Sequence, residues 1–269
     1  MPESKVVLVT GASSGFGKET TTLLSQHGFQ VFGTSRKPSA KEVGASVEML
    51  QLDIDSNESV NNCVRELMNK AERLDVLVNN AGYVLTGAIE ETSVDEAKSQ
   101  FETNFFGAVR MVRAVLPIMR KQGSGQIINI SSMAAVIPFP FEGYYAATKA
   151  ALLAYTEQLR YEVKNLGVDV SVLEPGFFRT NLGETRGTPM HTIGDYDQMR
   201  ARAITSLKEE FQKGGDPKLV AETISRIIKS KSPRFEYLSG KSGRYRALKR
   251  ILPQTMWESE LRRRWRLDN

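Results

Sequence analysis

A tyrosine and a lysine spaced four residues apart are the first residues in this chain whose types and spacing could do chemistry. They are Tyr145 and Lys149, in the run GYYAATK at 143–149. If the run is helical, their side chains share one face, because residues i and i+4 stack on a helix. A phenol beside an ammonium can exchange a proton with a substrate oxygen. The neighbouring Tyr144 stacks instead on Thr148, which brings no charge, so we expect Tyr144 to pack or to line a pocket.

The ammonium should change how readily the phenol ionises. A free tyrosine has a pKa of about 10, which makes it a poor base at neutral pH. One positive charge about 4 Å away contributes roughly 4 kcal/mol at an effective dielectric constant near 20, which would lower the phenol pKa by about 3 before desolvation opposes it. We therefore expect Lys149 to lower the pKa of Tyr145. No histidine is needed, and His27 and His191 lie in no recognised motif.

The same spacing occurs again at Tyr245 and Lys249, so it is not sufficient by itself. A serine stands thirteen residues before each tyrosine, Ser132 in the first copy and Ser232 in the second. Ser132 follows the apolar run IINIS, which predicts a buried strand ending where parallel sheets bind ligands. Ser232 is the last residue of the run KSKS, which has no strand character. We interpret the second copy as coincidence.

A glycine-rich turn near the start of the chain predicts a nucleotide site. The run TGASSGFGKE at 10–19 has glycines at 11, 15 and 17, between an apolar strand pattern and a helical pattern. Glycine lets the backbone approach phosphate closely, and the free N–H groups of a helix N-terminus favour an anion.

The end of the second strand pattern, VFGTSRKP, indicates which nucleotide is bound. An NAD site usually has a carboxylate there for the ribose hydroxyls. This chain has Ser35 instead, followed by Arg36 and Lys37. Positive charge beside the ribose suits a 2′-phosphate. We therefore favour NADP(H) over NAD(H), with solvated turn residues as the alternative reading.

Strand and helix patterns alternate around these motifs. We expect strands at 5–10, 30–34, 47–52, 76–78, 126–130, 169–173 and 235–238, and helices near 16–27, 57–72, 93–120, 145–165 and 217–229. The alternation predicts an α/β fold, a single Rossmann-like doubly wound parallel sheet of about seven strands with helices on both faces. Residues 1–240 would form the NADP-binding and catalytic domain. Its insertion at about 183–215 would be a substrate loop or a plain surface excursion.

Composition excludes several classes of protein. Of 269 residues, 41% are hydrophobic and 25% charged, as in an ordinary globular protein. No run of about 18 apolar residues predicts a membrane span, and the start of the chain has no signal-peptide layout. The single cysteine, Cys63, excludes an internal disulfide and favours a reducing, cytoplasmic location. We expect no metal ion.

The net charge of +5 is concentrated in one part of the chain. From Lys231 onward there are 11 Lys and Arg residues against 4 Asp and Glu. Basicity so confined argues against nucleic-acid binding. We expect residues 241–269, here called the C-terminal segment, to form a basic helical extension of the domain that is solvated or contacts a subunit. Contact with an acidic membrane surface or partner is the alternative.

These motifs, in this order, resemble those of the classical short-chain dehydrogenase/reductase family. The matches fall within about residues 5–240: TGASSGFG at 10–17, LDID at 52–55, NNAG at 79–82, NFFG at 104–107, INISS at 128–132, YYAATK at 144–149 and PGFFRT at 175–180. The resemblance implies that Tyr145 exchanges a proton with the substrate oxygen while the nicotinamide exchanges a hydride with the carbon. It implies that Ser132 binds that oxygen, Asn104 fixes a water, and Lys149 also binds the cofactor ribose.

The resemblance also implies a cofactor site spread over several loops. It puts Asp53 at the adenine, Asn80 near the adjacent ribose and Thr180 on the nicotinamide carboxamide. The expected cofactor-binding residues are Gly11, Ser13, Ser14, Gly15, Phe16, Gly17, Ser35, Arg36, Lys37, Asp53, Ile54, Asn80, Ala81, Gly82, Tyr145, Lys149, Pro175, Gly176, Phe178 and Thr180.

Aromatic residues near the expected nicotinamide end indicate an apolar substrate pocket. Phe139 and Phe141 precede the tyrosine, Phe177 follows the sixth strand, and Met190 lies in the insertion. Such walls suit an apolar carbonyl or alcohol, although each residue could equally be core packing. The runs AIEETS, VLPIMR and EPGFFRT most resemble 17β-hydroxysteroid and retinol dehydrogenases, which implies a steroid-, retinoid- or lipid-like small molecule.

The sequence therefore predicts an NADP(H)-dependent oxidoreductase that interconverts a carbonyl and an alcohol, with reduction as the expected direction. The alternatives are a catalytically idle NADP(H)-binding sensor and a scaffold protein of the same fold. In the family, the helices at 93–120 and 145–165 form subunit interfaces, so the resemblance implies a homodimer or homotetramer. Apolar residues on these helices include Val109, Val112, Leu116, Leu152, Tyr155 and Leu159.

Overall fold

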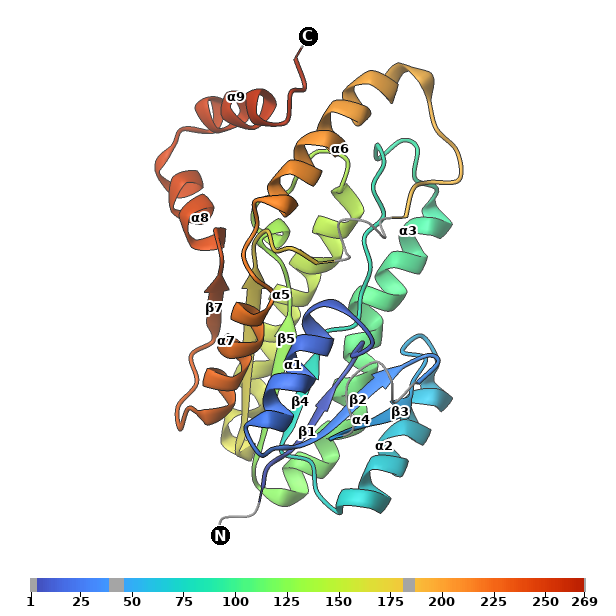
Figure 1. The fold of residues 1–269 in the computed structure, drawn as a ribbon, viewed down its shortest axis with the longest axis vertical. Helices are drawn as coiled ribbons and strands as arrows, with labels where there is room; N and C mark the ends of the chain where they lie inside the picture. The colour runs from blue at the N-terminus through green and yellow to red at the C-terminus, as the bar shows by residue number, and fades with distance from the viewer. Residues whose placement is uncertain (1–3, 39–45, 181–186, 269) are drawn as a thin grey trace.

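One parallel sheet forms the centre of the molecule (Figure 1). The structure is a computed structural model that describes residues 4–38, 46–180 and 187–268. The strands are β1 (Val6–Val9), β2 (Gln30–Ser35), β3 (Val47–Gln51), β4 (Val76–Asn79), β5 (Gly125–Ile130), β6 (Val168–Pro175) and β7 (Glu236–Ser239). All pairings are parallel, in the order β3-β2-β1-β4-β5-β6-β7. The predicted seven-stranded, doubly wound sheet is confirmed.

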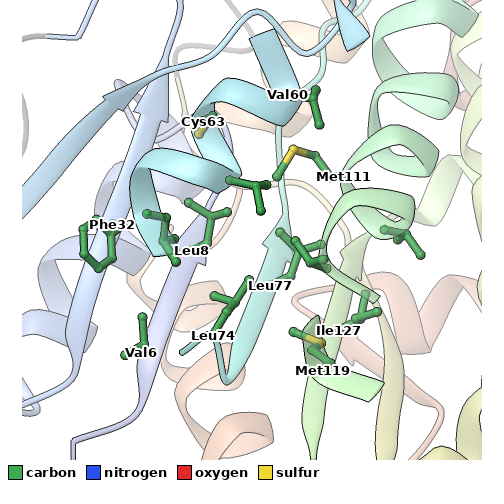
Figure 2. Close-up of a cluster of buried hydrophobic side chains, with 14 of the residues drawn as sticks. Val6, Leu8, Phe32, Val60, Cys63, Leu74, Leu77, Met111, Met119 and Ile127 are labelled. Atoms are coloured by element: carbon green, nitrogen blue, oxygen red, sulfur yellow. The ribbon is translucent and has the colours of Figure 1, made fainter. Parts of the chain in front are cut away.

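Helices cover both faces of the sheet and create two apolar cores. The helices α1 (Gly15–Gln26) and α7 (Lys218–Lys229) cover one face, and α2 (Asn57–Ala71), α4 (Gly107–Gln122) and α5 (Gly143–Val163) cover the other. In β1, Val6 and Leu8 join the core on the α2 and α4 side, shown in Figure 2. Val7 and Val9 join the core on the α1 and α7 side. Successive side chains of a strand point to opposite faces, so a strand between two helical layers must be apolar at every position.

The single helix predicted over 93–120 is instead three consecutive pieces. A capping box of Ser93 and Glu96 starts α3 (Val94–Phe101), a π-helical turn follows at Glu102–Phe106, and α4 continues the path. A π-turn holds one extra residue, which changes the face on which the following side chains point. Asn104 lies inside this turn and is 1% exposed.

The predicted subunit-interface residues are partly used inside the monomer. Val112, Leu152 and Leu159 are buried within the chain, whereas Val109, Leu116 and Tyr155 are half-buried. The apolar pattern of these helices is therefore explained in part by the monomer core, and the subunit contact stays a prediction.

The insertion contains a helix that is fastened to the loop after β4. Its described part includes α6 (Asp197–Gln212), while 183–186 lie outside the described residues. The carboxylate of Glu91 accepts hydrogen bonds from the backbone N–H groups of Ile193 at 2.9 Å and Ala88 at 2.8 Å, and it pairs with Arg200. The insertion is thus docked against residues 84–96.

The C-terminal segment forms α8 (Ser242–Ile251) and α9 (Gln254–Arg264), which lie at the same end of the molecule as α6 (Figure 1). None of the helices within the described residues is long and apolar enough to cross a membrane.

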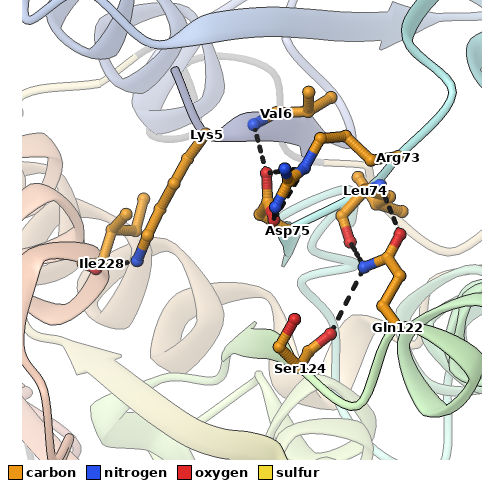
Figure 3. Close-up of polar contacts among 8 residues, drawn as sticks. All are labelled: Lys5, Val6, Arg73, Leu74, Asp75, Gln122, Ser124 and Ile228. Carbon is orange, nitrogen blue, oxygen red and sulfur yellow. Dashed lines mark hydrogen bonds and ion pairs between the residues drawn. The ribbon is translucent and has the colours of Figure 1, made fainter. Parts of the chain in front are cut away.

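A polar cluster fastens the opposite, amino-terminal edge of the sheet (Figure 3). Asp75 accepts a hydrogen bond from the backbone N–H of Val6 at 2.7 Å and pairs with Arg73 at 2.7 Å. The side chain of Gln122 bonds to both backbone groups of Leu74, at 2.9 and 3.1 Å. These contacts join β1, β4 and α4 at the edge away from the expected site.

Candidate active site

The predicted site residues gather at the carboxyl edge of the sheet. The chain moves outward from β1 to β2 and β3, then returns to place β4 on the other side of β1. The loops after β1 and β4 therefore diverge, and such a switch point is where parallel α/β sheets bind ligands. The glycine turn follows β1, the NNAG run ends β4, Ser132 follows β5 and the PGFFRT run ends β6.

The glycine turn after β1 is shaped so tightly that side chains would not fit. Gly11 has a positive φ of 66°, and a Cβ added to it would lie 2.9 Å from the Cα of Ala81. A Cβ on Gly17 would lie 2.2 Å from the carbonyl oxygen of Gly11. Ser14 is the N-cap of α1, yet its side chain makes no capping hydrogen bond. The first N–H groups of α1 are thus not capped by Ser14, as an anion-binding helix end requires.

The NNAG run supports this turn. The side-chain amide of Asn80 donates to the carbonyl oxygens of Thr10 at 2.9 Å and Gly11 at 3.1 Å. The hydroxyl of Thr10 accepts from the backbone N–H groups of Asn80 and Ala81 at 2.9 and 3.0 Å. Asn80 therefore holds the glycine turn in place, a contact that the sequence did not predict.

The ends of β2 and β3 carry the residues expected at the adenosine. The hydroxyl oxygen of Ser35 is buried and has no hydrogen-bond partner among the described residues, whereas Arg36 and Lys37 are exposed. Asp53 is exposed, and Ile54 is buried against Gly107 of α4. A buried hydroxyl without a partner fits a ribose hydroxyl or phosphate oxygen, and the tight turn fits a pyrophosphate. The residues present therefore fit a nicotinamide dinucleotide.

Tyr145, Lys149 and Ser132 converge beside this turn. Both Tyr145 and Lys149 lie on α5 and are buried, with Lys149 5% exposed. The Nζ of Lys149 donates to the carbonyl oxygen of Ile130 at 2.8 Å and lies 5.9 Å from the centre of the Tyr145 ring. The hydroxyl of Ser132 is hydrogen-bonded to the Tyr145 phenol and accepts from the backbone N–H of Ala134 at 3.1 Å.

Asn104 lies close to Lys149 but is anchored within the chain. Its Oδ1 accepts from the backbone N–H of Tyr83 at 2.9 Å, and its Nδ2 donates to Tyr83 O at 2.9 Å and Thr148 Oγ1 at 3.2 Å. A Cβ on Gly82 would lie 2.9 Å from Asn104 Oδ1 and 3.8 Å from Lys149 Nζ. Gly82 therefore leaves open the space beside Asn104 and Lys149.

Burial dominates the pKa values of this group. Burial raises the pKa of Tyr145 above its ordinary value, and the hydrogen bond with Ser132 only partly offsets that rise. Burial also lowers the pKa of Lys149 from 10.5 to about 8. The predicted lowering of the tyrosine pKa by the ammonium is therefore wrong for this structure, because desolvation disfavours both charged forms. Tyr145 keeps its proton at neutral pH, as a general acid must.

A narrow cavity of about 40 Å³ opens beside Tyr145. Two of the expected pocket residues, Phe139 and Phe177, line it, and so does Thr180, which was expected at the nicotinamide carboxamide. Sequence reasoning missed Glu142, which stands three residues before Tyr145, and Phe211, an aromatic residue in the polar insertion helix. The described lining is Phe16, Val84, Ser131, Ser132, Met133, Phe139, Glu142, Tyr145, Pro175, Gly176, Phe177, Thr180 and Phe211.

Three predicted site residues do not line the cavity. Met190 is 83% exposed. Its backbone N–H donates to the carboxylate of Glu96, which fixes the backbone there and leaves the side chain in solvent. Phe141 has a positive φ of 64°, and its ring packs 6.5 Å from that of Tyr196. Phe178 is fully buried and packs edge-on against Phe16 at 5.4 Å, so its ring is a core residue.

The remaining residues of the glycine turn connect it to the cavity. Ser13 is half-buried in the turn, Gly15 opens α1 with a φ of 53°, and Phe16 reaches the cavity. The turn and the cavity are therefore contiguous through Phe16.

The C-terminal segment forms a second layer behind the cavity wall. Trp265 is 0% exposed, and its ring centre lies 5.2 Å from that of Phe139 and 6.1 Å from that of Phe177. Tyr245 lies 6.3 Å from Phe177. Most residues of α9 are exposed, but Trp257 within it and Trp265 directly after it are buried, since large apolar rings gain free energy from burial. The segment is therefore part of the wall that encloses the cavity.

The basic residues of this segment are largely paired. Arg264 bonds to Glu210 at 2.9 Å and Arg266 to Glu209 at 3.0 Å, both on α6. Arg262 and Arg263 pair with Asp268 and Glu260. Because each of these arginines has an acidic partner, their charge contributes little to attraction toward an acidic surface.

The second Tyr-x-x-x-Lys copy is not a second site. Ser232 is exposed and precedes β7, whereas Tyr245 lies on α8, which follows the opposite end of that strand. Lys249 donates to the carbonyl oxygen of Val136. The serine and the tyrosine are thus separated by the length of a strand.

Known proteins resemble this chain over most of its length. The family model for short chain dehydrogenases matches residues 5–190. A 3-ketodihydrosphingosine reductase from Bacteroides thetaiotaomicron is 40% identical over 235 residues, which is 87% of each chain. A short-chain dehydrogenase structure from Streptomyces avermitilis superposes with a TM-score of 0.80 at 33% identity, over 97% of this chain and 98% of that one. A serine dehydrogenase structure complexed with NADP+ gives a TM-score of 0.76 at 28% identity, over 87% and 94%.

The fold, the residues that converge at the edge of the sheet and these relatives all indicate one family. The chain belongs to the short-chain dehydrogenase family, and it is an oxidoreductase that uses a nicotinamide cofactor.

Proposed function

We propose that the protein is an NADPH-dependent reductase of lipid-like ketones, with Tyr145 as the general acid. The observation that carries this proposal is the buried Tyr145 phenol, hydrogen-bonded to Ser132 and lining a cavity walled by Phe139 and Phe177. A buried, neutral phenol is set up to donate a proton, which suits reduction of a carbonyl better than oxidation of an alcohol.

Each protein group has a defined part in this reaction. The hydroxyls of Ser132 and Tyr145 both donate hydrogen bonds to the ketone oxygen, which polarises the carbonyl. When bound, the reduced cofactor supplies the hydride that adds to the carbonyl carbon. Tyr145 gives its proton to the oxygen, so the ketone becomes an alcohol and the phenol becomes a phenolate. The ammonium of Lys149 stabilises that phenolate until solvent returns the proton.

The apolar wall of the cavity and the name of one relative's substrate support a substrate with an alkyl chain. The cavity wall is mainly aromatic and aliphatic, which favours a hydrocarbon chain. The relative that is 40% identical is a 3-ketodihydrosphingosine reductase, and the substrate in its name is a ketone with a long alkyl chain and an amino group. We extend that substrate class to this chain.

The residues after β2 support NADPH over NADH. Ser35 offers a hydroxyl without a partner among the described residues, and the exposed Arg36 and Lys37 follow it. A solved relative, 28% identical, carries NADP+. Two cations beside a ribose suit a 2′-phosphate. In addition, Ser35 occupies the position where an NAD site usually has a carboxylate for the free 2′-hydroxyl.

The test compares wild type with Tyr145→Phe in one assay. We expect wild-type protein to oxidise NADPH with 3-ketodihydrosphingosine, and with a lower kcat/KM when NADH replaces NADPH. Tyr145→Phe should lower kcat by about 10²- to 10⁴-fold, because it removes the proton donor. The Kd for NADPH, measured by fluorescence, should stay within about twofold, because the phenyl ring keeps the packing.

Two outcomes contradict the proposal. If wild-type protein binds NADPH but reduces no steroid, retinoid, aliphatic or long-chain amino ketone, the protein is a nucleotide-binding sensor. If Tyr145→Phe keeps the wild-type kcat, another group supplies the proton.

A further inference from the structure

We propose that Glu142 determines substrate specificity by binding a positively charged amino group on the carbon next to the ketone. This inference rests on the proposed ketone reduction and names the substrate class of the same cavity. Glu142 is 3% exposed and lines that cavity together with Tyr145 and Ser132. The proposed ligand is therefore a long-chain α-amino ketone.

Local helix structure does not account for this side chain. Glu142 is the N-cap residue of α5, where a polar side chain usually accepts a hydrogen bond from the first helical turn, but its side chain makes no such bond. Its backbone meets the local needs, because its N–H donates to Phe139 O at 3.2 Å and its carbonyl accepts from Ala146 N at 2.9 Å. Glu142 therefore lines the cavity without capping the helix.

The charge of Glu142 stands out against the rest of the wall. Among the described residues that line the cavity, Glu142 is the one with a formal charge; the others are aromatic, aliphatic, glycine, proline or hydroxyl residues. A carboxylate in such surroundings costs free energy, and a positive charge offsets that cost. A carboxylate can accept about four hydrogen bonds, so contacts within the chain still leave room for a ligand. The matching ligand is cationic at one point and apolar elsewhere.

The position of Glu142 relative to Tyr145 fixes where the cation lies. The two residues are three positions apart at the start of α5, and residues i and i+3 are neighbours on a helix. A ketone oxygen bound by Tyr145 and Ser132 puts an amine on the adjacent carbon within reach of the carboxylate. The alkyl chain then extends along Phe139 and Phe177. The substrate named for the 40% identical relative has this arrangement of ketone, neighbouring amine and chain.

The experiment uses two variants and two substrates. The substrates are 3-ketodihydrosphingosine and its N-acetylated form, which has the same chain and no positive charge. Glu142→Gln keeps the shape and removes the charge, and Glu222→Gln, on the exposed face of α7, is the matched control. In Glu142→Gln, we expect kcat/KM for the amine substrate to fall about 10- to 100-fold, mainly through KM, with the neutral substrate changed less than about threefold. Glu142→Asp should recover part of the loss.

The proposal is overturned if Glu142→Gln lowers kcat/KM equally for both substrates, because the residue would then be structural. It is also overturned if wild-type enzyme does not prefer the amine. Calorimetric binding of the long-chain amino alcohol product to NADP+-loaded protein separates this inference from the proposed activity. If neither ketone is reduced, a Kd that rises at least about tenfold in Glu142→Gln still supports amine binding, and an unchanged Kd rules it out.

Discussion

At Tyr145, burial and the hydrogen bond with Ser132 shift the phenol pKa in opposite directions, and burial is the larger effect. The same burial lowers the pKa of the Lys149 ammonium to about 8. The phenol therefore stays protonated across the neutral range, while the lysine loses its charge near the upper end of it. In the proposed reaction, the proton donor and the group that stabilises its conjugate base therefore have separate pH limits.

The expected pH profile of ketone reduction follows from the raised pKa of Tyr145 and the lowered pKa of Lys149. Tyr145 must be protonated, and its raised pKa keeps it so; Lys149 must be charged, and its lowered pKa removes that charge above about pH 8. We expect kcat/KM to be level from about pH 6 to pH 7.5 and to fall above about pH 8. Initial rates with saturating NADPH measure this profile. A level profile up to about pH 10 would show that the lysine charge is not needed.

Arginine at this position provides the control. Lys149→Arg keeps a positive charge at every pH in that range, because a guanidinium does not deprotonate. The altered geometry should lower the activity of this variant. The activity that remains should not decline above about pH 8.

At the scale of elements, the insertion is positioned by one buried acid. Glu91 accepts two backbone N–H groups and pairs with Arg200 of α6. Burial by itself would raise the pKa of Glu91, but these hydrogen bonds and the nearby guanidinium together lower it. A carboxyl with a lowered folded-state pKa stabilises the fold above its unfolded pKa of about 4.5, and that stabilisation is lost as the pH falls through the folded value.

Removing the charge of Glu91 should loosen the insertion. Glu91→Gln leaves Arg200 with the exposed Asp197 as its ionised partner but breaks the buried half of the network, and breaking a buried pair typically costs up to about 3–5 kcal/mol. We expect faster proteolytic cleavage between residues 187 and 215 and a higher KM for the ketone, because Phe211 of α6 lines the cavity. Glu222→Gln, on the exposed face of α7, is the control. Equal cleavage rates for wild type and Glu91→Gln would refute this role.

At the scale of the whole molecule, the wall of the cavity is built from distant parts of the chain. Phe139 precedes α5, Phe177 follows β6, and Trp265 follows α9, yet their rings pack together. Ion pairs between α6 and the C-terminal segment, such as Arg264 with Glu210, hold the same layer. The wall of the cavity and the global stability of the protein therefore depend on one aromatic cluster.

Trp265→Ala tests that link. Truncating a fully buried aromatic side chain typically costs about 3–5 kcal/mol, which lowers Tm by about 2–4 °C per kcal/mol in a chain of this size. Met256→Ala, in the same segment but 56% exposed, should leave Tm nearly unchanged. Thermal unfolding followed by circular dichroism measures both variants. Equal Tm values for the two would mean that the segment does not contribute to the core.

The sequence predicts those features that depend on local pattern. Runs of β-branched residues located all seven strands, and the glycine spacing located the turn after β1. The direction of the Tyr145 pKa shift was not predictable, because it depends on how deeply α5 is buried. The outward position of Met190 depends on how the insertion turns, and the contact of Trp265 with Phe139 joins segments far apart in the sequence. Long-range packing leaves no local signal.

The aromatic cluster also has a consequence for how the protein is made. A ribosome synthesises the chain from its N-terminus, so the glycine turn and the first five strands exist well before residue 265. Domains and their parts begin to fold during synthesis, in the order in which they emerge. The cofactor cradle can therefore form while Phe139 and Phe177 still lack Trp265. A nascent chain should acquire the ability to hold a nucleotide earlier than the ability to enclose a ketone.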